Sequence, residues 1–244
     1  MTIGIIGNGW VGKAVHKLFP DAVVHSRTEP NLLAFEADYV FICVPTPLLE
    51  SGVLDCSIVR DSIEKCSKES VIIVRSTVNP GFCDSLDRDV CFQPEYLGET
   101  ANHPLLDEKK TQFIILGGKP NIRRKVIELY QKVYNANITI RQVTNYEAEV
   151  IKLSENRAIA FKVLQCQELY DACEKHGVDY YTIRDAVYGD DPRFNLWFSF
   201  IYPGNRSITS SKCLQKDVPA WTAWADTQLT KDLLKYDETL RQKT

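Results

Sequence analysis

The chain has 244 residues, of which 44% are hydrophobic and 25% charged, and its formal net charge is −3. This is an ordinary globular composition, enough for one large domain or two small ones, with no basic face that would suit nucleic acid. No apolar run approaches the length of a membrane span, and the N-terminus resembles a strand more than a signal peptide. We therefore expect a soluble cytoplasmic protein without a membrane partner.

The cysteines give no sign of a metal site. The eight are Cys43, Cys56, Cys66, Cys83, Cys91, Cys166, Cys173 and Cys213. No two of them form a Cys-x-x-Cys pair, so we expect no bound metal. Without a secretion signal they are predicted to be reduced thiols, most of them small core residues.

An apolar strand that begins at residue 2 runs directly into a glycine-rich turn, and a helical pattern follows. Strand, Gly-x-Gly-x-x-Gly and helix in this order are the dinucleotide-binding fingerprint. Gly7 permits the tight turn, Gly9 lets the backbone approach a pyrophosphate, and Gly12 lets the helix pack closely on the strand. The positive end of the helix then faces the phosphates. The expected cofactor contacts here are Gly7, Asn8, Gly9, Trp10, Val11 and Gly12.

The end of the second predicted strand, residues 22–25, leaves the choice of cofactor open. NAD-specific folds often carry an acidic side chain there, which binds the ribose hydroxyls. This chain has Ser26 and Arg27 instead. An arginine facing a 2′-phosphate would favour NADP. The alternative is a loop arginine beside NAD that is bound without an acidic contact.

Strands and helices then alternate, which predicts an α/β fold with a Rossmann-like doubly wound parallel sheet over residues 1–143. The further strands are expected at residues 37–44, 71–74, 91–93, 112–116 and 138–141, and helices at residues 55–65 and 121–134. The carboxyl edge of such a sheet binds ligands. The residues expected at this edge are Val44, Pro45, Thr46, Ser76 and Thr77.

Residues 144–244 are predicted to form a mainly helical domain. Thr144 and Glu147 form a capping box for a helix that reaches about His176, with Gly177 as its stop. Some 30 residues make a rod of roughly 45–50 Å, so we expect a spine between two domains or two subunits. Lys152 and Asn156 lie four residues apart on one face of this helix. On periodicity alone, they are a solvated lysine and a neutral helical asparagine.

A cysteine stands near the start of a later helix. After a short predicted helix over residues 178–187 and an aromatic run, a polar loop over residues 204–212 leads to Cys213. Cys213 is expected to begin a helix that carries Pro219 in its first turn, and an amphipathic helix and a charged tail follow. A thiol beside a lysine at a helix start has its thiolate stabilised by the dipole and the charge. An inert, partly exposed cysteine is the alternative.

Several short motifs in unbroken order over roughly residues 1–225 resemble the family of UDP-glucose 6-dehydrogenase and its relatives for GDP-mannose and UDP-N-acetylmannosamine. They are Gly7-x-Gly9-x-x-Gly12, Val44-Pro45-Thr46-Pro47 with Gly52-x-x-Asp55, Arg75-Ser76-Thr77-Val78, Pro94-Glu95-Tyr96-Leu97-Gly98-Glu99, Glu149-x-x-Lys152-Leu153-x-x-Asn156, Asp191-Pro192-Arg193 and Cys213-Leu214-Gln215-Lys216-Asp217. Together they are far more specific than any one alone, and they favour functional roles for Lys152, Asn156 and Cys213.

The resemblance implies oxidation of the CH₂OH of a nucleotide sugar to a carboxylate in two hydride transfers, with two NAD in turn. A cysteine then traps the aldehyde as a thiohemiacetal, which the second transfer converts to a thioester. A lysine and an asparagine stabilise the oxyanion, an aspartate orients water or assists proton transfer, and a glutamate is the base for hydrolysis beside a water-holding threonine. In this sequence these are, in the same order, Cys213, Lys152, Asn156, Asp217, Glu95 and Thr77.

The resemblance also implies the binding contacts. Ser76, Glu99 and Lys216 resemble cofactor contacts, and Arg193 resembles an arginine that reaches the sugar nucleotide across a homodimer built on the long helix. The full implied substrate set is Glu95, Tyr96, Leu97, Gly98, Glu99, Lys152, Asn156 and Arg193.

Two departures from the family pattern concern the substrate. Residues 207–212, Ser-Ile-Thr-Ser-Ser-Lys, stand where the family has a glycine-rich loop that approaches the sugar nucleotide. The family also carries a third, UDP-binding domain after the cysteine helix, which this sequence is expected to lack. A separate chain then supplies that half of the pocket, the substrate is held differently, or the chain is not fully active.

Two other functions stay open. A β-hydroxyacid dehydrogenase also joins a Rossmann domain to a long helix with a lysine and an asparagine, but it makes one hydride transfer and needs no cysteine. Ser26 and Arg27 suit its NADP-dependent members. The second is a catalytically silent dinucleotide-binding or regulatory protein.

Overall fold

The computed structural model describes residues 1–98, 107–191, 193–202 and 204–241, and the chain divides into two compact units. Unit 1 comprises residues 1–49 and 54–152, and unit 2 comprises residues 50–53 and 153–244. The division falls inside the long helix α4 (Asn145–His176), whereas the sequence places the domain boundary just before this helix. The first turns of α4 belong to unit 1 because their side chains bond there: Asn145 Oδ1, for example, accepts from Phe92 N at 3.0 Å.

Unit 1 is built on a parallel sheet of five strands in the order β2-β1-β3-β4-β5. The strands are β1 (Ile3–Ile6), β2 (Val23–His25), β3 (Tyr39–Ile42), β4 (Val71–Val74) and β5 (Cys91–Phe92). The predicted α/β class is therefore confirmed. The last two predicted strands, β6 (Phe113–Leu116) and β7 (Thr139–Gln142), instead pair with each other in a separate parallel sheet. Gly117 N donates to Phe92 O at 2.8 Å just beyond β6.

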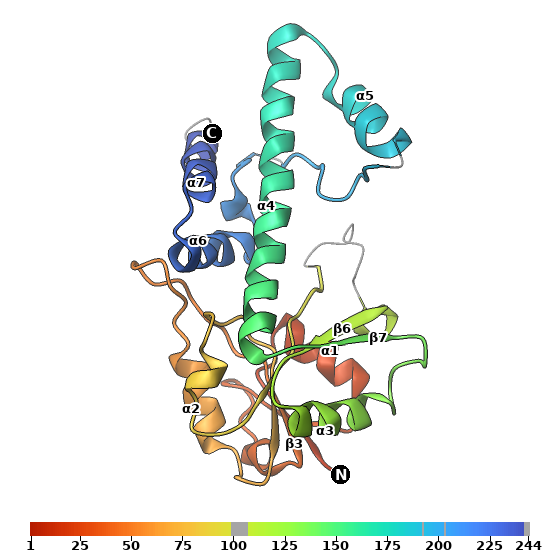
Figure 1. Cartoon of the computed structure of the whole chain (residues 1–244), viewed down its shortest axis with the longest axis vertical. Coiled ribbons are helices and arrows are strands. Elements are labelled where there is room, and N and C mark those ends of the chain that lie inside the picture. Colours follow the sequence, from red (N-terminus) through yellow and green to blue (C-terminus); the bar gives the residue numbers. More distant parts are fainter. Residues whose placement is uncertain (99–106, 192, 203, 242–244) are drawn as a thin grey trace. The chain divides into compact units, whose positions relative to one another are not determined.

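Helices cover both faces of the five-stranded sheet. On one face, α1 (Trp10–Leu18) and α3 (Pro120–Tyr130) pack their apolar sides against alternate strand residues such as Ile5 and Phe41. On the other face lie a 3₁₀ turn, η1 (Leu32–Glu36), and helix α2 (Ser57–Lys65), which contacts β3 (Figure 1). This alternation follows from the two-residue period of strands, and it makes the sheet doubly wound as predicted.

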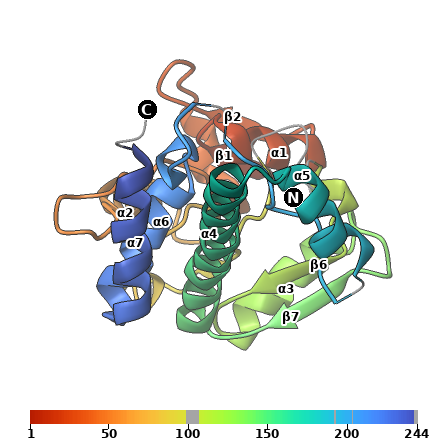
Figure 2. The same cartoon turned by 90° about the horizontal axis from the view of Figure 1, so that it is seen from above.

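Unit 2 is helical, and the greater part of α4 forms its longest element. At 1.5 Å per residue, the 32 residues of α4 span roughly 48 Å. In both views, α6 (Leu214–Ala225) and α7 (Gln228–Arg241) lie on one side of α4 and α5 (Tyr180–Asp185) on the other (Figures 1 and 2). A π-helical turn, η4 (Ala186–Asp190), follows α5. No helix among the described residues is long and apolar enough to cross a membrane.

The ends of α4 and the start of α6 follow the sequence prediction, but the place of Pro219 within α6 does not. Thr144 Oγ1 accepts from Glu147 N at 3.2 Å and Glu147 Oε2 accepts from Thr144 N at 2.8 Å, so the capping box is confirmed. Gly177 ends α4 in the left-handed region, with φ +66°. The placement of Pro219 in a first turn is wrong, because α6 begins at Leu214 and Pro219 is its sixth residue. There its missing N–H removes an interior helix bond.

Candidate active site

The glycine turn between β1 and α1 is shaped by close backbone contacts. Gly7 has φ +106°, and a Cβ there would lie 2.3 Å from the carbonyl oxygen of Cys43. A Cβ on Gly12 would lie 1.9 Å from the oxygen of Gly7. Neither position can hold a side chain without moving the backbone, because real Cβ atoms do not come this close to an oxygen. The turn therefore lies tightly against the loop that follows β3.

The start of α1 forms an open cradle at the same edge of the sheet. Gly9 is exposed, and a Cβ on it would meet no other atom within 4 Å. Within the described part of the chain, no side chain caps the helix at Gly9. The first N–H groups of α1 and its positive end are thus available to an anion, and Asn8, Trp10 and Val11 flank them. The cradle lies beside the switch point between β1 and β3, and its shape fits the pyrophosphate of NAD.

The loops after β3 and β4 are joined at this edge. Ser76 Oγ donates to Val44 O at 2.7 Å, and Thr46 Oγ1 donates to Thr77 O at 2.7 Å. These two bonds join the loop after β3 to the loop after β4, and so bring together Val44, Thr46, Ser76 and Thr77, all predicted cofactor residues. Pro45 lies between Val44 and Thr46. Ser76 and Thr46 are buried, so their hydroxyls serve the loops themselves.

The turn after β2 carries the residues that bear on cofactor choice. Ser26 Oγ accepts from Glu29 N at 3.0 Å, and Ser26 N donates to Glu29 O at 3.0 Å. This closes a turn that leaves Arg27 exposed. The contact of Ser26 and Arg27 with the cofactor, and with it NADP in place of NAD, stays a prediction.

In unit 1 the predicted base and lysine lie in contact. Lys152, 4% exposed, donates to the main-chain oxygen of Glu95, and its Nζ lies 5.3 Å from the ring centre of Tyr96. The Glu95 carboxylate accepts from Leu97 N. Burial raises the pKa of Glu95 above its usual 4.5, although Lys152 and Arg75 act in the opposite direction. Gly98 ends the described part of this loop, and the predicted Glu99 lies outside the described residues.

In unit 2 one carboxylate joins α4 to the cysteine helix. Cys213 is the N-cap residue of α6 and is partly exposed. Asp217, fully buried, accepts from Asn156 Nδ2 at 2.5 Å and from Lys216 Nζ at 2.6 Å. Asp217 therefore orients the Asn156 amide, and Lys216, which the sequence assigns to the cofactor, also bonds to Asp217.

Arg193 lies on the surface of unit 2. Its side chain is 80% exposed and pairs with Asp191 at 2.6 Å. Exposed apolar side chains follow it along the chain, among them Phe194 and Trp197. The middle residue of its motif, Pro192, lies outside the described residues.

Several other cysteines are more buried than Cys213, and burial raises the pKa of their thiols. It raises the pKa of Cys43 and of Cys91 to about 12, and that of Cys66 to about 11. These thiols stay protonated at neutral pH, whereas a nucleophilic cysteine must supply a thiolate. Cys213, partly exposed at the positive end of a helix, is not buried in this way. No group of three or more His, Cys, Asp or Glu able to hold a metal occurs among the described residues.

Sequence reasoning assigned no role to three buried charged residues of unit 1, Glu149, Arg75 and Glu108. Glu149, fully buried, accepts from Gly81 N at 2.5 Å and from Cys83 N at 2.8 Å. Arg75 and Glu108 form a buried ion pair at 2.5 Å. A signal for the first was present: the polar residues 145, 149, 152 and 156 recur at helical spacing and so form one stripe.

Two family models match the chain in sequence order. The NAD-binding domain of the UDP-glucose/GDP-mannose dehydrogenase family matches residues 15–136, and the central domain of the same family matches residues 146–240.

Individual relatives agree with these matches. A UDP-glucose 6-dehydrogenase from Rickettsia bellii is 27% identical over 227 residues, which cover 84% of this chain and 50% of that protein. The chain thus spans about half the length of the curated relatives it matches. A UDP-D-ManNAc dehydrogenase structure from Pyrococcus horikoshii, 19% identical, superposes with a TM-score of 0.80 and covers 98% of this chain and 69% of its own.

The fold is also shared more widely. A 3-hydroxyisobutyrate dehydrogenase from Mycobacterium tuberculosis, 16% identical, has a TM-score of 0.66 over 98% of this chain and 93% of its own. At this identity the likeness shows the fold alone, whereas the two family models assign both halves of the sequence. The chain belongs to the UDP-glucose/GDP-mannose dehydrogenase family, with its NAD-binding domain followed by its central domain.

Proposed function

We propose that this chain oxidises the CH₂OH group of a nucleotide sugar, of the kind represented by UDP-glucose, to a carboxylate in two stages through Cys213. The observation that carries the proposal is the buried carboxylate of Asp217. Asp217 lies four residues after Cys213, the N-cap of α6, and it bonds to Asn156 of α4. A fully buried carboxylate that joins two helices beside a partly exposed thiol is a costly arrangement, which a reactive cysteine would explain.

In this proposal Cys213 is the nucleophile. The positive end of α6 favours negative charge on its sulfur. The thiolate adds to the aldehyde carbon to form a thiohemiacetal, the second oxidation gives a thioester, and water then breaks the carbon–sulfur bond and releases the carboxylate and the thiol. The amide of Asn156, held by Asp217, would steady the oxyanion, and Lys152 would add a cation.

Glu95 would be the base that activates this water. Burial raises the pKa of the Glu95 carboxyl above its usual value, which makes its carboxylate a stronger base. Thr77, partly exposed in the loop after β4, would hold the water. Bound at the cradle between β1 and α1, NAD supplies the hydride acceptor for both oxidations.

The test uses the purified chain with UDP-glucose and with GDP-mannose, and with NAD and NADP in turn. The absorbance of reduced nicotinamide and the amount of sugar acid are both followed. We expect two reduced cofactors per carboxylate, and Cys213→Ser should abolish carboxylate formation while the affinity for NAD is kept. Gln215→Ala, an exposed change on the same helix, is the matched control. A fully active Cys213→Ser variant would exclude the mechanism.

The shared fold with 3-hydroxyisobutyrate dehydrogenase gives the second candidate a specific basis. A β-hydroxyacid dehydrogenase would reduce one cofactor per product and would not need Cys213. The stoichiometry therefore separates the two functions. Cofactor binding without turnover on any substrate of either class would favour a catalytically silent dinucleotide-binding protein.

We further propose a homodimer in the cytoplasm, built on the long helix α4 and extended by the aromatic run after Arg193. The aromatic run after Arg193 supports an interface, because Phe194, Trp197 and Phe200 are 52%, 49% and 42% exposed and such apolar side chains gather at contact surfaces. The eight free thiols suit a reducing compartment. Sedimentation of the wild type against Trp197→Ser tests the dimer, and an unchanged mass for the variant contradicts this interface.

A further inference from the structure

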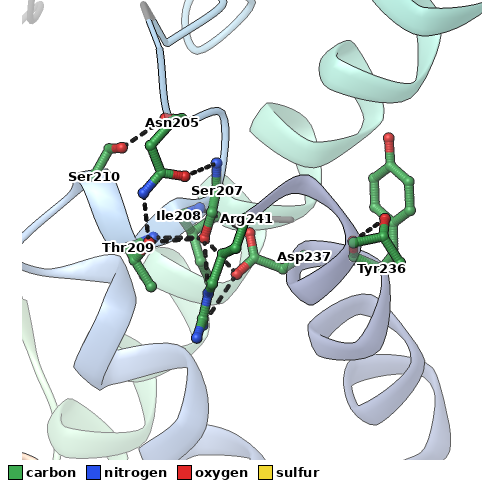
Figure 3. Close-up of polar contacts among 9 residues, drawn as sticks. Asn205, Ser207, Ile208, Thr209, Ser210, Tyr236, Asp237 and Arg241 are labelled. Carbon is green, nitrogen blue, oxygen red and sulfur yellow. Dashed lines mark hydrogen bonds and ion pairs between the residues drawn. The ribbon is translucent and has the colours of Figure 1, made fainter. Parts of the chain in front are cut away.

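The segment before Cys213 is a compact turn held by its own polar side chains (Figure 3). It contains the 3₁₀ turn η5 (Ile208–Ser210), with Ser207 as its N-cap. Ser207 Oγ accepts from Thr209 N at 3.1 Å, and Asn205 Oδ1 accepts from Ser207 N at 3.0 Å. The side chains of Asn205 and Ser207 thus cap main-chain N–H groups of this segment.

A carboxylate from a distant helix completes the turn. Asp237 of α7 is fully buried. Its Oδ2 accepts from Ser207 Oγ at 2.8 Å and its Oδ1 accepts from Ile208 N at 2.8 Å, while Arg241 Nη2 lies 3.4 Å from Oδ2 (Figure 3). Each carboxylate oxygen therefore holds one donor of η5. Charge-assisted bonds of this kind are among the strongest in a protein interior.

The bonds of this turn use its main-chain donors. Ser210 N donates to Ser207 O at 3.1 Å, and Ser211 N donates to Ile208 O at 3.0 Å. Together with the bonds above, five successive N–H groups, those of residues 207–211, donate to acceptors inside the chain. A segment whose amides are all engaged in this way braces its neighbours rather than offering donors to a ligand.

The brace continues directly into the cysteine helix. Ser211 Oγ accepts from Leu214 N at 3.2 Å, and Ser211 O accepts from Gln215 N at 3.2 Å. Ile208 packs in one buried cluster with Leu214. Cys213 lies in the chain between Ser211 and Leu214, which are bonded to each other. The position of its sulfur therefore depends on the position of η5.

We propose that Asp237 is a positioning residue for Cys213: by fixing Ser207 and the N–H of Ile208, it holds the turn that sets the cysteine at the start of α6. The inference rests on the proposed role of Cys213 as the nucleophile. It assigns to α7 a part in the chemistry although Asp237 itself touches no reacting atom.

The decisive measurement is the reactivity of Cys213 in Asp237→Ala. Iodoacetamide labelling of Cys213, counted by mass spectrometry across a pH series, reports the thiolate without any sugar substrate. We expect the labelling midpoint to move to higher pH, because a displaced sulfur loses its fixed place at the positive end of the helix. We also expect kcat to fall about 10²-fold, as for small misplacements of reacting groups, with the KM for NAD unchanged.

Two further variants grade the effect. Asp237→Asn keeps an acceptor for the N–H of Ile208 and should restore most of the wild-type labelling profile. Asp232→Asn is the matched control, because Asp232 lies on the same helix, bonds only to Gln228 and Lys235 in the bonds described, and is 55% exposed. It should leave the profile unchanged.

The outcomes separate this inference from the proposed function. A folded Asp237→Ala variant with the wild-type labelling profile overturns the positioning role, whatever the enzyme activity. If Asp237→Ala does not fold, Ser207→Ala removes one of the two bonds and must shift the midpoint in the same direction, and an unshifted profile overturns the inference. A wild-type chain that oxidises no sugar contradicts the proposed function, while the labelling still decides the role of Asp237.

Discussion

Two buried carboxylates hold a turn each, one in either unit. In unit 1, Glu149 accepts from the N–H groups of Gly81 and Cys83 at 2.5 and 2.8 Å. In unit 2, Asp237 accepts from the hydroxyl of Ser207 and the N–H of Ile208, both at 2.8 Å. Both carboxylates are fully buried, yet the turns they hold differ in what else secures them.

The difference lies in the donors. Glu149 binds two main-chain amides, which cannot turn toward another acceptor when the carboxylate is lost. Asp237 binds one amide and one hydroxyl, and the hydroxyl of Ser207 can rotate toward Thr209 Oγ1, 2.9 Å away. We therefore expect the Glu149 carboxylate to contribute mainly to the stability of unit 1. The Asp237 carboxylate should contribute mainly to the position of Cys213 in unit 2.

The largest effect is expected for Glu149→Ala. It leaves the buried N–H of Cys83 and the partly buried N–H of Gly81 without an acceptor. A fully buried group of this kind costs about 1–3 kcal/mol, so the free energy of unfolding should fall by roughly 3–4 kcal/mol. Urea denaturation measures this loss. The labelling profile of Cys213 in the folded variant should match the wild type. A loss under about 1 kcal/mol, or a shifted profile, would contradict the assigned division of roles.

Asp237→Ala should be milder in stability. Of the three groups that bond to Asp237, only the N–H of Ile208 finds no new acceptor. The Ser207 hydroxyl can reorient, and Arg241, which is half exposed, can bond to water. We expect a loss of about 2 kcal/mol in the same urea experiment. If this loss exceeds that of Glu149→Ala, the comparison between the two turns is reversed.

Gly81→Ala tests the backbone of the first turn alone. Gly81 has φ +89°, and a Cβ there would lie 3.8 Å from the Tyr146 ring, which is an ordinary contact. The cost should therefore come from the left-handed conformation only, about 1–2 kcal/mol. Thermal unfolding reads it out. An effect near zero would show that the turn relaxes without strain, and that Glu149 alone secures it.

The smallest effect is a change in pH dependence. Burial raises the pKa of Glu149 above 4.5, Asp84 adds to the rise, and the bonds from Cys83 and Gly81 oppose it. Below pH 4.5 the protonated Glu149 carboxyl contributes fully to the stability of the folded chain. As the pH rises, the unfolded chain loses this proton first, and the contribution disappears as the pH passes the raised folded-state pKa. Glu149→Gln should therefore show a flatter decline of stability as the pH rises above 4.5. Identical slopes in both proteins would contradict the raised pKa.

Local features were predictable from the sequence, and long-range ones were not. The capping box of Thr144 and Glu147 depends on residues three apart, and the glycine turn after β1 on a fixed short spacing, so both are visible in the letters alone. The Glu149–Gly81 bond joins residues 68 apart and the Ser207–Asp237 bond residues 30 apart. Such pairs depend on how elements pack, which single-sequence periodicity does not report.

The same reason explains the partial success at the candidate site. Asn156 and Asp217 were named through family motifs, but their mutual bond spans 61 residues and no spacing rule predicts it. The error over Pro219 arose because proline is commonest near helix starts, whereas the α6 backbone tolerates it six residues in.

The continuity of α4 across both units limits how this sequence can vary. Lys152 is the last residue of unit 1, and Asn156 lies one turn further along the same helix. Inserting or deleting a single residue between them would turn every later side chain by ~100° about the axis and slide it by ~1.5 Å. A change in the length of this stretch would therefore displace Asn156 from the helix face that it shares with Lys152.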